Sequence, residues 1–224
     1  MKGTLEQIQK RIGELMAQKD QVIIAIDGNC TAGKTTLAGM LAEVYDCNVF
    51  HMDDFFLRPE QRTPERYAEI GGNVDYERFT EEVLIPLQAG KPFSYRPFDC
   101  GTFEQTEPVG VTPEKLNIIE GTYSLHPYFG DPYDLKIFLT VTPELQCERI
   151  LERPAFLHGR FFEEWIPMEQ KYFNGFSVAD QCDMIVKCRK EGYGELIINY
   201  ACFLQNLDYN AGKKPKKVSY EKTE

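Results

Sequence analysis

The stretch that decides the fold runs from Val22 to Leu41 and reads VIIAIDGNCTAGKTTLAGML. It opens with an apolar, β-branched run over 22–26, which is typical of a strand buried on both faces. Residues 28–35 then spell G-x-x-x-x-G-K-T, and the apolar spacing from Thr36 predicts a helix to about Tyr45. A strand, a glycine-containing loop and a helix in this order predict a phosphate-binding loop. The alternative is an ordinary strand–turn–helix that matches the motif by chance, and the flanking strand and helix make it the weaker interpretation.

The residue types of this loop suit a triphosphate. Gly28 and Gly33 permit the backbone dihedrals that let successive N–H groups curl round an anion, and the helix N-terminus adds partial positive charge. Lys34 can reach the β- and γ-phosphates, and the Thr35 hydroxyl can hold Mg²⁺. We therefore predict that a nucleoside triphosphate binds at Gly28, Asn29, Cys30, Thr31, Ala32, Gly33, Lys34, Thr35 and Thr36.

Composition limits the class of protein. The chain has 224 residues, 42% of them hydrophobic and 27% charged, which suits one ordinary soluble α/β domain. Its formal charge of −10 argues against nucleic acid as the main partner. Seven scattered cysteines without a C-x-x-C pair indicate neither a disulfide framework nor a zinc site. No apolar run would span a membrane, and no signal-peptide core opens the chain, so we expect a cytoplasmic protein.

The rest of the chain alternates helical and strand patterns around this loop. We expect an N-terminal amphipathic helix over 4–19, with Thr4 and Gln7 as a capping box. Further buried strands are predicted at 48–52, 116–120, 135–141 and 183–186, and helices at 75–87, 143–153 and 161–173, the last kinked by Pro167. The expected organisation is a packed helix (1–20), a core domain (21–190), and a C-terminal helix over 196–207 with a polar tail (191–224).

Two strand ends carry acids. Asp53 and Asp54 follow the second strand, and Glu120 ends the third. Open α/β sheets place ligands at the carboxyl ends of strands, so Asp53 could take a proton from a hydroxyl or hold a magnesium-bound water. Asp54 is interpreted mainly as a turn cap. Glu120 could steady magnesium, the alternative being an ordinary solvated acid.

Two later segments have two interpretations each. Residues 91–111 are rich in proline and aromatics, and predict a hairpin whose rings either cover a flat ligand or pack as lid and core. Arg149, Arg153 and Arg160 follow the fourth strand. They could close over a triphosphate and neutralise its charge, or be scattered surface arginines.

Taken in order, these motifs resemble the uridine kinase-like group of P-loop kinases, which also includes pantothenate, nicotinamide riboside and phosphoribulose kinases. The resemblance rests on the phosphate loop, on Asp53-Asp54-Phe55-Phe56, on Ile118-Ile119-Glu120-Gly121, and on Arg149 with Gly159-Arg160. It implies a three-layer P-loop NTPase fold, with a five-stranded parallel sheet in the order 2-3-1-4-5, helices on both faces, and an arginine lid over about 153–165. It also implies ATP, magnesium and a hydroxyl-bearing acceptor.

Carried over residue by residue, the resemblance implies roles at three places. The catalytic set would be Asp53, Lys34, Arg149 and Arg160; magnesium would lie at Thr35, Glu120 and Asp53; the acceptor would contact Asp53, Tyr95, Phe98, Asp99 and Phe103. The chain departs from the pyrimidine-binding pattern, because Phe98 replaces a tyrosine and Phe103 stands where histidine is expected. His158 also stands where the lid commonly has arginine.

The function expected from the sequence is therefore transfer of the γ-phosphoryl of ATP to a small hydroxyl compound. The favoured acceptor is the 5′-OH of a nucleoside such as uridine or cytidine. Pantothenate, nicotinamide riboside and sugar phosphates are alternatives, as is a catalytically silent nucleotide-binding regulator. A GTPase ranks last, because D-x-x-G and N-K-x-D are missing. We expect no nucleic-acid or membrane partner and leave a homo-oligomer open.

Overall fold

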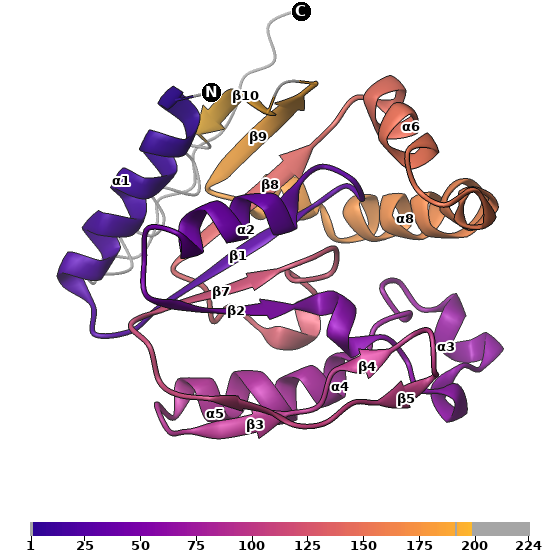
Figure 1. Cartoon of the computed structure of the whole chain (residues 1–224), viewed down its shortest axis with the longest axis horizontal. Coiled ribbons are helices and arrows are strands. Elements are labelled where there is room, and N and C mark those ends of the chain that lie inside the picture. The colour runs from indigo at the N-terminus through magenta and orange to yellow at the C-terminus, as the bar shows by residue number, and fades with distance from the viewer. Residues whose placement is uncertain (1, 191, 199–224) are drawn as a thin grey trace, which may run out of the picture.

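A computed structural model describes residues 2–190 and 192–198 and has a six-stranded central sheet in the order β10-β9-β8-β1-β7-β2 (Figure 1). Five strands are parallel: β1 (Val22–Gly28), β2 (Cys47–His51), β7 (Leu116–Glu120), β8 (Leu135–Thr140) and β9 (Met184–Arg189). Across the sheet these strands lie in the order β2-β7-β1-β8-β9. Numbered 1 to 5 along the chain, they have the predicted order 2-3-1-4-5. The predicted fold class and strand order are confirmed.

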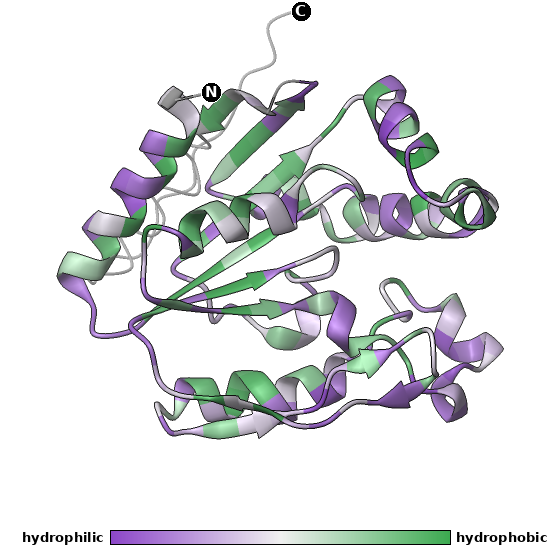
Figure 2. Ribbon diagram, in the orientation of Figure 1, coloured by the Kyte–Doolittle hydropathy of each residue, from purple (hydrophilic) through white to green (hydrophobic). Residues whose placement is uncertain are grey.

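Helices cover both faces of this sheet. On one face, α1 (Lys2–Gln18) and α2 (Lys34–Ala42) pack on the sheet through Ile8, Ile12, Leu37 and Leu41. On the other face, the helical segment that includes α4 (Tyr76–Phe79) and α5 (Ile85–Gln88) shares a second core cluster with α8 (Ile166–Phe176). Every residue of β1 and β7 is buried, as both-face burial requires. Figure 2 shows the hydrophobic residues concentrated on these central strands.

Two helical segments contain a π turn immediately before a proline-bearing α-helix. The turn η3 (Thr80–Leu84) precedes Pro86 in α5, and η6 (Phe161–Trp165) precedes Pro167 in α8. Proline removes an N–H donor and crowds the preceding turn, and a wider π turn accommodates both effects. The predicted division of 161–173 at Pro167 therefore takes the form of a π turn within a helical segment.

The segment 91–111 forms the predicted hairpin, in two pairs of short antiparallel strands. The outer pair is β3 (Phe93–Tyr95) with β6 (Val109–Val111), and the inner pair is β4 (Phe98–Asp99) with β5 (Glu104–Gln105). The remaining elements are short helical segments in the connections. They are η1 (Met52–Phe55), η2 (Pro59–Gln61), α3 (Pro64–Ala68), η4 (Pro127–Phe129), α6 (Pro143–Leu151), η5 (Ala155–Leu157), α7 (His158–Arg160) and η7 (Val178–Gln181).

Two predictions at the chain ends are corrected. The helix expected from Leu196 is wrong over its first residues, because β10 (Gly192–Ile198) pairs antiparallel with β9; residues 199–207 lie outside the described residues. Edge pairing with β9 and burial of Tyr193 override the helical spacing. Thr4 lies inside α1, and its hydroxyl donates to the Gly194 carbonyl at 2.8 Å, so it does not cap the helix. No helix in residues 2–190 and 192–198 is long and apolar enough to cross a membrane.

Candidate active site

The phosphate loop has the backbone that its glycines predict. Gly28 has φ 135°, and a Cβ there would lie 1.9 Å from the Leu139 carbonyl oxygen, so the close approach to β8 requires glycine. Gly33 adopts φ 92° at the N-cap of α2, and Thr31 also has a positive φ of 61°. The hydroxyl oxygen of Thr31 is buried and has no hydrogen-bond partner among the described residues. A loop held in this conformation with an unsatisfied polar atom fits a polar ligand.

Lys34 lies folded over this loop. Its Nζ donates to the carbonyl oxygens of Gly28 at 2.8 Å and Asn29 at 2.9 Å, and to the Thr122 hydroxyl at 3.2 Å, while the residue is 9% exposed. All three acceptors are neutral oxygens. A phosphate oxygen accepts a stronger, charge-assisted bond from an ammonium and can replace them.

Thr35 and Glu120 meet at the carboxyl edge of the sheet. The register sets Ile26 of β1 and His51 of β2 opposite Glu120, so three strand ends coincide. The exposed Thr35 donates its hydroxyl to Glu120 Oε1 at 3.0 Å, and Glu120 is 4% exposed. The structure thus brings together two of the three predicted magnesium residues.

His51 joins this group, although the sequence analysis gave it no role. Its Nδ1 lies 2.5 Å from Glu120 Oε1, and this hydrogen bond raises the pKa of His51. His51 lies in the predicted second strand, which neighbours the strand that ends in Glu120. This position could have indicated the contact between His51 and Glu120.

The two neighbouring acids, Asp53 and Asp54, lie in different surroundings. Asp53 keeps an exposed surface, yet the protein around it desolvates the carboxyl and raises its pKa, an effect that the charge of Lys34 opposes. Asp54 is tied into the scaffold: its carbonyl accepts from Arg78 Nη2 at 2.8 Å, and its carboxylate accepts from the Tyr95 hydroxyl at 3.4 Å. Asp53 is therefore the acid that remains available to a substrate.

The donor set suits magnesium. Within the described part of the chain, no three histidine, cysteine, aspartate or glutamate residues are arranged to hold a metal by themselves. Mg²⁺ usually keeps several waters and takes one or two protein oxygens together with substrate phosphates. The hydroxyl of Thr35 and the carboxylates of Glu120 and Asp53 are oxygen donors of that kind.

The predicted acceptor residues occupy different environments. The ring of Tyr95 lies 5.9 Å from that of Phe50 and 5.5 Å from that of Phe55, and both Tyr95 and Phe98 are buried. Phe103 is 49% exposed. Asp99 accepts the Gly101 N–H at 2.7 Å, inside the hairpin turn. Of the three rings, Phe103 is thus the one with a large exposed surface.

The predicted arginines Arg149 and Arg160 contact different parts of the protein. Arg149 of α6 donates to the Thr31 carbonyl at 2.7 Å and to the Arg189 carbonyl at 2.9 Å, so it lies against the phosphate loop. Arg160 of α7 pairs with Glu164 at 3.3 Å, and its guanidinium carbon lies 5.0 Å from the Trp165 ring centroid, within the segment predicted to form a lid.

The buried carboxylate of Glu169 was not predicted from the sequence. It is 2% exposed and accepts the Cys30 N–H at 2.8 Å, Gln146 Nε2 at 2.9 Å and Asn29 Nδ2 at 3.5 Å. Burial and then the charge of Glu169 raise the pKa of the Cys30 thiol to about 12. The Cys30 thiol is therefore a poor nucleophile near neutral pH.

A second missed carboxylate, Asp27, precedes the loop. It is fully buried and accepts from the N–H groups of Gly28 at 2.6 Å and Leu125 at 3.0 Å and from the Tyr172 hydroxyl at 2.8 Å. Burial raises its pKa to about 6 despite these hydrogen bonds and the charge of Lys34. Glu169 and Tyr172 are one turn apart on α8, a helical spacing that could have indicated a shared face.

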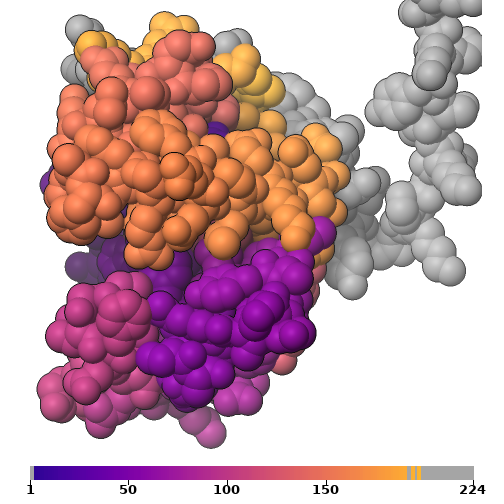
Figure 3. Space-filling view, turned by 90° about the vertical axis from the view of Figure 1, so that its right-hand side faces the viewer, coloured from indigo at the N-terminus to yellow at the C-terminus, as the bar shows by residue number. Residues whose placement is uncertain are grey.

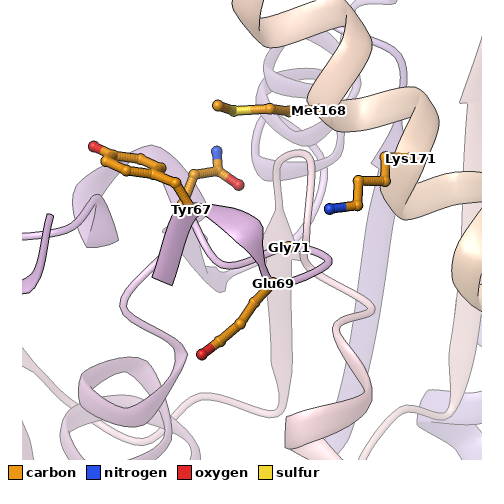
Figure 4. A pocket seen from close by; sticks show the side chains of 6 residues that line it. Tyr67, Glu69, Gly71, Met168 and Lys171 are labelled. Carbon is orange, nitrogen blue, oxygen red and sulfur yellow. The ribbon is translucent and has the colours of Figure 1, made fainter. Parts of the chain in front are cut away.

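The surface of the molecule is hollowed between two groups of elements (Figure 3). Figure 3 shows the surface recessed between the lid with α8 above and α3 with the β4–β5 hairpin below. Figure 4 shows the side chains around a smaller hollow, where Met168 and Lys171 of α8 face Tyr67, Glu69 and Gly71. Lys171 Nζ donates to the Ala68 carbonyl at 2.7 Å and so joins α8 to α3 there.

No protein-family model matches this chain, and no curated protein sequence matches it. Solved structures do. A possible uridine kinase from Bacillus stearothermophilus superposes with a TM-score of 0.58 at 19% identity, over 80% of this chain and 98% of that one. Phosphoribulokinase from Rhodobacter spheroides superposes with a TM-score of 0.52 at 15% identity, over 75% and 70%. The fold is that of the P-loop kinases. The resemblance drawn from the sequence motifs is confirmed at the level of this fold.

Proposed function

We propose that this P-loop protein is an ATP- and magnesium-dependent kinase that phosphorylates a hydroxyl group of a small molecule. The observation that carries the proposal is the 3.0 Å bond between Thr35 and Glu120, which joins the end of the phosphate loop to a neighbouring strand end. A loop lysine, a loop hydroxyl and strand-end acids are the parts that phosphoryl transfer needs, because its transition state demands positioning and charge neutralisation.

Each residue has a role in this reaction. Main-chain N–H groups of the loop and Lys34 bind the phosphates, and Thr35 with Glu120 and Asp53 would hold magnesium, which neutralises phosphate charge when bound. The acceptor hydroxyl oxygen forms a bond to the γ-phosphorus as the bond to the β–γ bridging oxygen breaks, and ADP leaves. Asp53 orients the hydroxyl and takes its proton late. Arg149 supports the loop, and Arg160 approaches from the lid.

The acceptor within this proposal is a small alcohol. The 5′-OH of a nucleoside is the acceptor that the sequence motifs favour, and pantothenate, nicotinamide riboside and sugar phosphates belong to the same group. The cleft between the lid and the β4–β5 hairpin is where we place it, next to Asp53.

The proposal is tested by a coupled assay of ADP release across these acceptors, with magnesium present and absent. We expect acceptor-dependent, magnesium-dependent ADP release and a phosphorylated product with the mass of one added phosphate. Tight ATP binding without ADP release for any acceptor would instead identify a silent nucleotide-binding protein and contradict the kinase proposal.

A further inference from the structure

Arg62 lies on the hairpin side of the cleft, with its guanidinium over two of the rings expected to contact the acceptor. Its guanidinium carbon is 4.8 Å from the centroid of the Phe103 ring and 5.7 Å from that of Phe98. Its Nε donates to the Leu57 carbonyl at 2.9 Å, and this hydrogen bond fixes the plane of the guanidinium group. A guanidinium held in this way is positioned by its surroundings at little further entropic cost.

This guanidinium has no carboxylate within ion-pair distance in the described part of the chain, although acids outnumber bases by 35 to 25 in the sequence. Arg58, Arg66 and Arg78, from the same region, each pair with an acid. The two Nη groups of Arg62 donate to none of the described residues and are not among the buried unsatisfied atoms. They are therefore free to bind a ligand.

The position of Arg62 relative to the reacting groups follows from packing. Phe98 belongs to β4, which packs against η1, the element that carries Asp53. The hairpin that carries Phe98 thus packs against the element that carries Asp53.

Phe103 is held in an unusual conformation at this place. Its φ is 59°, in the left-handed region that a bulky residue rarely adopts, and its exposed ring lies under the guanidinium. Non-glycine residues in this region are strained and cluster at ligand sites. With Arg62 over the two rings, the hairpin offers the acceptor a cation rather than a free aromatic face.

We propose that the acceptor is an alcohol that also carries a phosphate or carboxylate group, which the Arg62 guanidinium binds while the reacting hydroxyl lies at Asp53. The inference rests on the proposed kinase function and narrows its acceptor. A planar fork binds both anions in a bidentate manner, which gives orientation as well as charge neutralisation. Such an acceptor needs a cation here, because the floor of the site is acidic and the second substrate is a triphosphate.

The test compares charged and neutral members of matched acceptor pairs on the full chain. The pairs are D-ribulose 5-phosphate with D-ribulose, D-glycerate with glycerol, and pantothenate with pantothenol, and uridine is the neutral nucleoside. Two readouts are used: ADP release, and calorimetric binding in the presence of magnesium and a non-hydrolysable ATP analogue. The first pair tests a phosphate, and the other two test a carboxylate.

We expect the wild type to prefer the charged member of a pair, and Arg62→Ala to weaken that member by about 10- to 100-fold in kcat/KM or Kd. The neutral member and the KM for ATP should not change. Arg62→Lys, which keeps the charge and loses the fork, should fall in between. Arg96→Ala is the matched control, because Arg96 lies on the same hairpin and donates to the Thr106 carbonyl at 3.1 Å. Thermal melting of each variant verifies folding, and Arg62→Lys serves the comparison if Arg62→Ala is unstable.

The outcomes separate this inference from the kinase proposal. Preference for uridine or another neutral alcohol would overturn the inference without contradicting the kinase proposal. An equal loss in kcat/KM or Kd for charged and neutral members in Arg62→Ala would do the same. Arg62-dependent binding of a charged alcohol without ADP release would support the inference and contradict the kinase. No binding of any charged member would overturn the inference.

Discussion

The carboxylate of Glu169, on α8, accepts a hydrogen bond from the backbone N–H of Cys30 in the phosphate loop at 2.8 Å. The same carboxylate accepts from Gln146 of α6 at 2.9 Å. Because the predicted lid, over about 153–165, runs directly into α8, this contact joins that segment to the loop. Glu169 is a positioning residue whose effect on nucleotide binding passes through the loop backbone.

Glu169→Ala should therefore weaken ATP binding and lower stability together. It leaves the Cys30 N–H and the Gln146 amide without their partner, which costs about 1–3 kcal/mol. Glu169→Gln keeps one acceptor oxygen and should lose less. ATP titration and thermal unfolding of both variants measure this, with Glu164→Gln as control, because Glu164 makes only an exposed pair with Arg160. Glu169→Ala behaving like Glu164→Gln would contradict a positioning role.

Asp53→Asn should lower kcat by about 10²- to 10⁴-fold, because it removes the group that takes the acceptor proton. The ATP dissociation constant should stay close to that of the wild type, because the loop is untouched and Asp53 would contact magnesium only through a bound water, which Asn can also hold. Asp54→Asn is the matched control, since Asp54 contacts Tyr95 within the scaffold. Single-turnover rates and ATP titrations of the two variants decide the matter. Equal losses in both variants, or full turnover in Asp53→Asn, would remove Asp53 as the base.

Glu120→Gln should raise the magnesium concentration needed for half-maximal ATP binding by about 10- to 100-fold. The substitution keeps an acceptor for the Thr35 hydroxyl but removes the negative charge beside it. Fluorescence titration of ATP at varied magnesium measures the shift. Glu114→Gln, in the connection two residues before β7, should leave the requirement unchanged, and a shift of equal size there would argue against a local effect.

The buried carboxyl of Asp27 predicts a specific pH dependence of stability. Its pKa is raised from 3.8 to about 6 by burial, so the folded state holds the proton more tightly than the unfolded state. A raised carboxyl pKa favours the folded state at low pH, and this contribution is lost as pH rises from about 4 to about 6. The loss is about 3 kcal/mol, at 1.36 kcal/mol per pKa unit.

Urea unfolding between pH 4 and pH 7.5 tests this for the wild type and Asp27→Asn. The free energy of unfolding of the wild type, relative to that of Asp27→Asn, should fall across this window and level off above it. Tyr172→Phe removes a hydrogen bond that lowers the Asp27 pKa, so the fall should extend to higher pH in that variant. A difference that does not change with pH would contradict the assignment.

The sheet and the loop could be predicted because their signals are local. The apolar run at 22–26, the spacing of Gly28 and Gly33 and the strand-end acids each lie within one short stretch. Glu169, His51 and Arg62 could not be placed in the same way, because their partners lie elsewhere in the chain, Glu169 and Cys30 being 139 residues apart. The conformation of β10 was likewise not predictable from local sequence, because edge pairing with β9 decides it.

The central claim is that the loop from Gly28 to Thr35 binds magnesium-bound ATP, and calorimetric titration of ATP into the wild type and Lys34→Ala tests it most directly. Lys34→Ala removes the ammonium over the loop and should weaken ATP binding by about 10- to 100-fold. Lys190→Ala, which removes a surface pair with Glu148, should bind like the wild type. ATP binding that is equal in Lys34→Ala and wild type, or that does not respond to magnesium, would contradict the account.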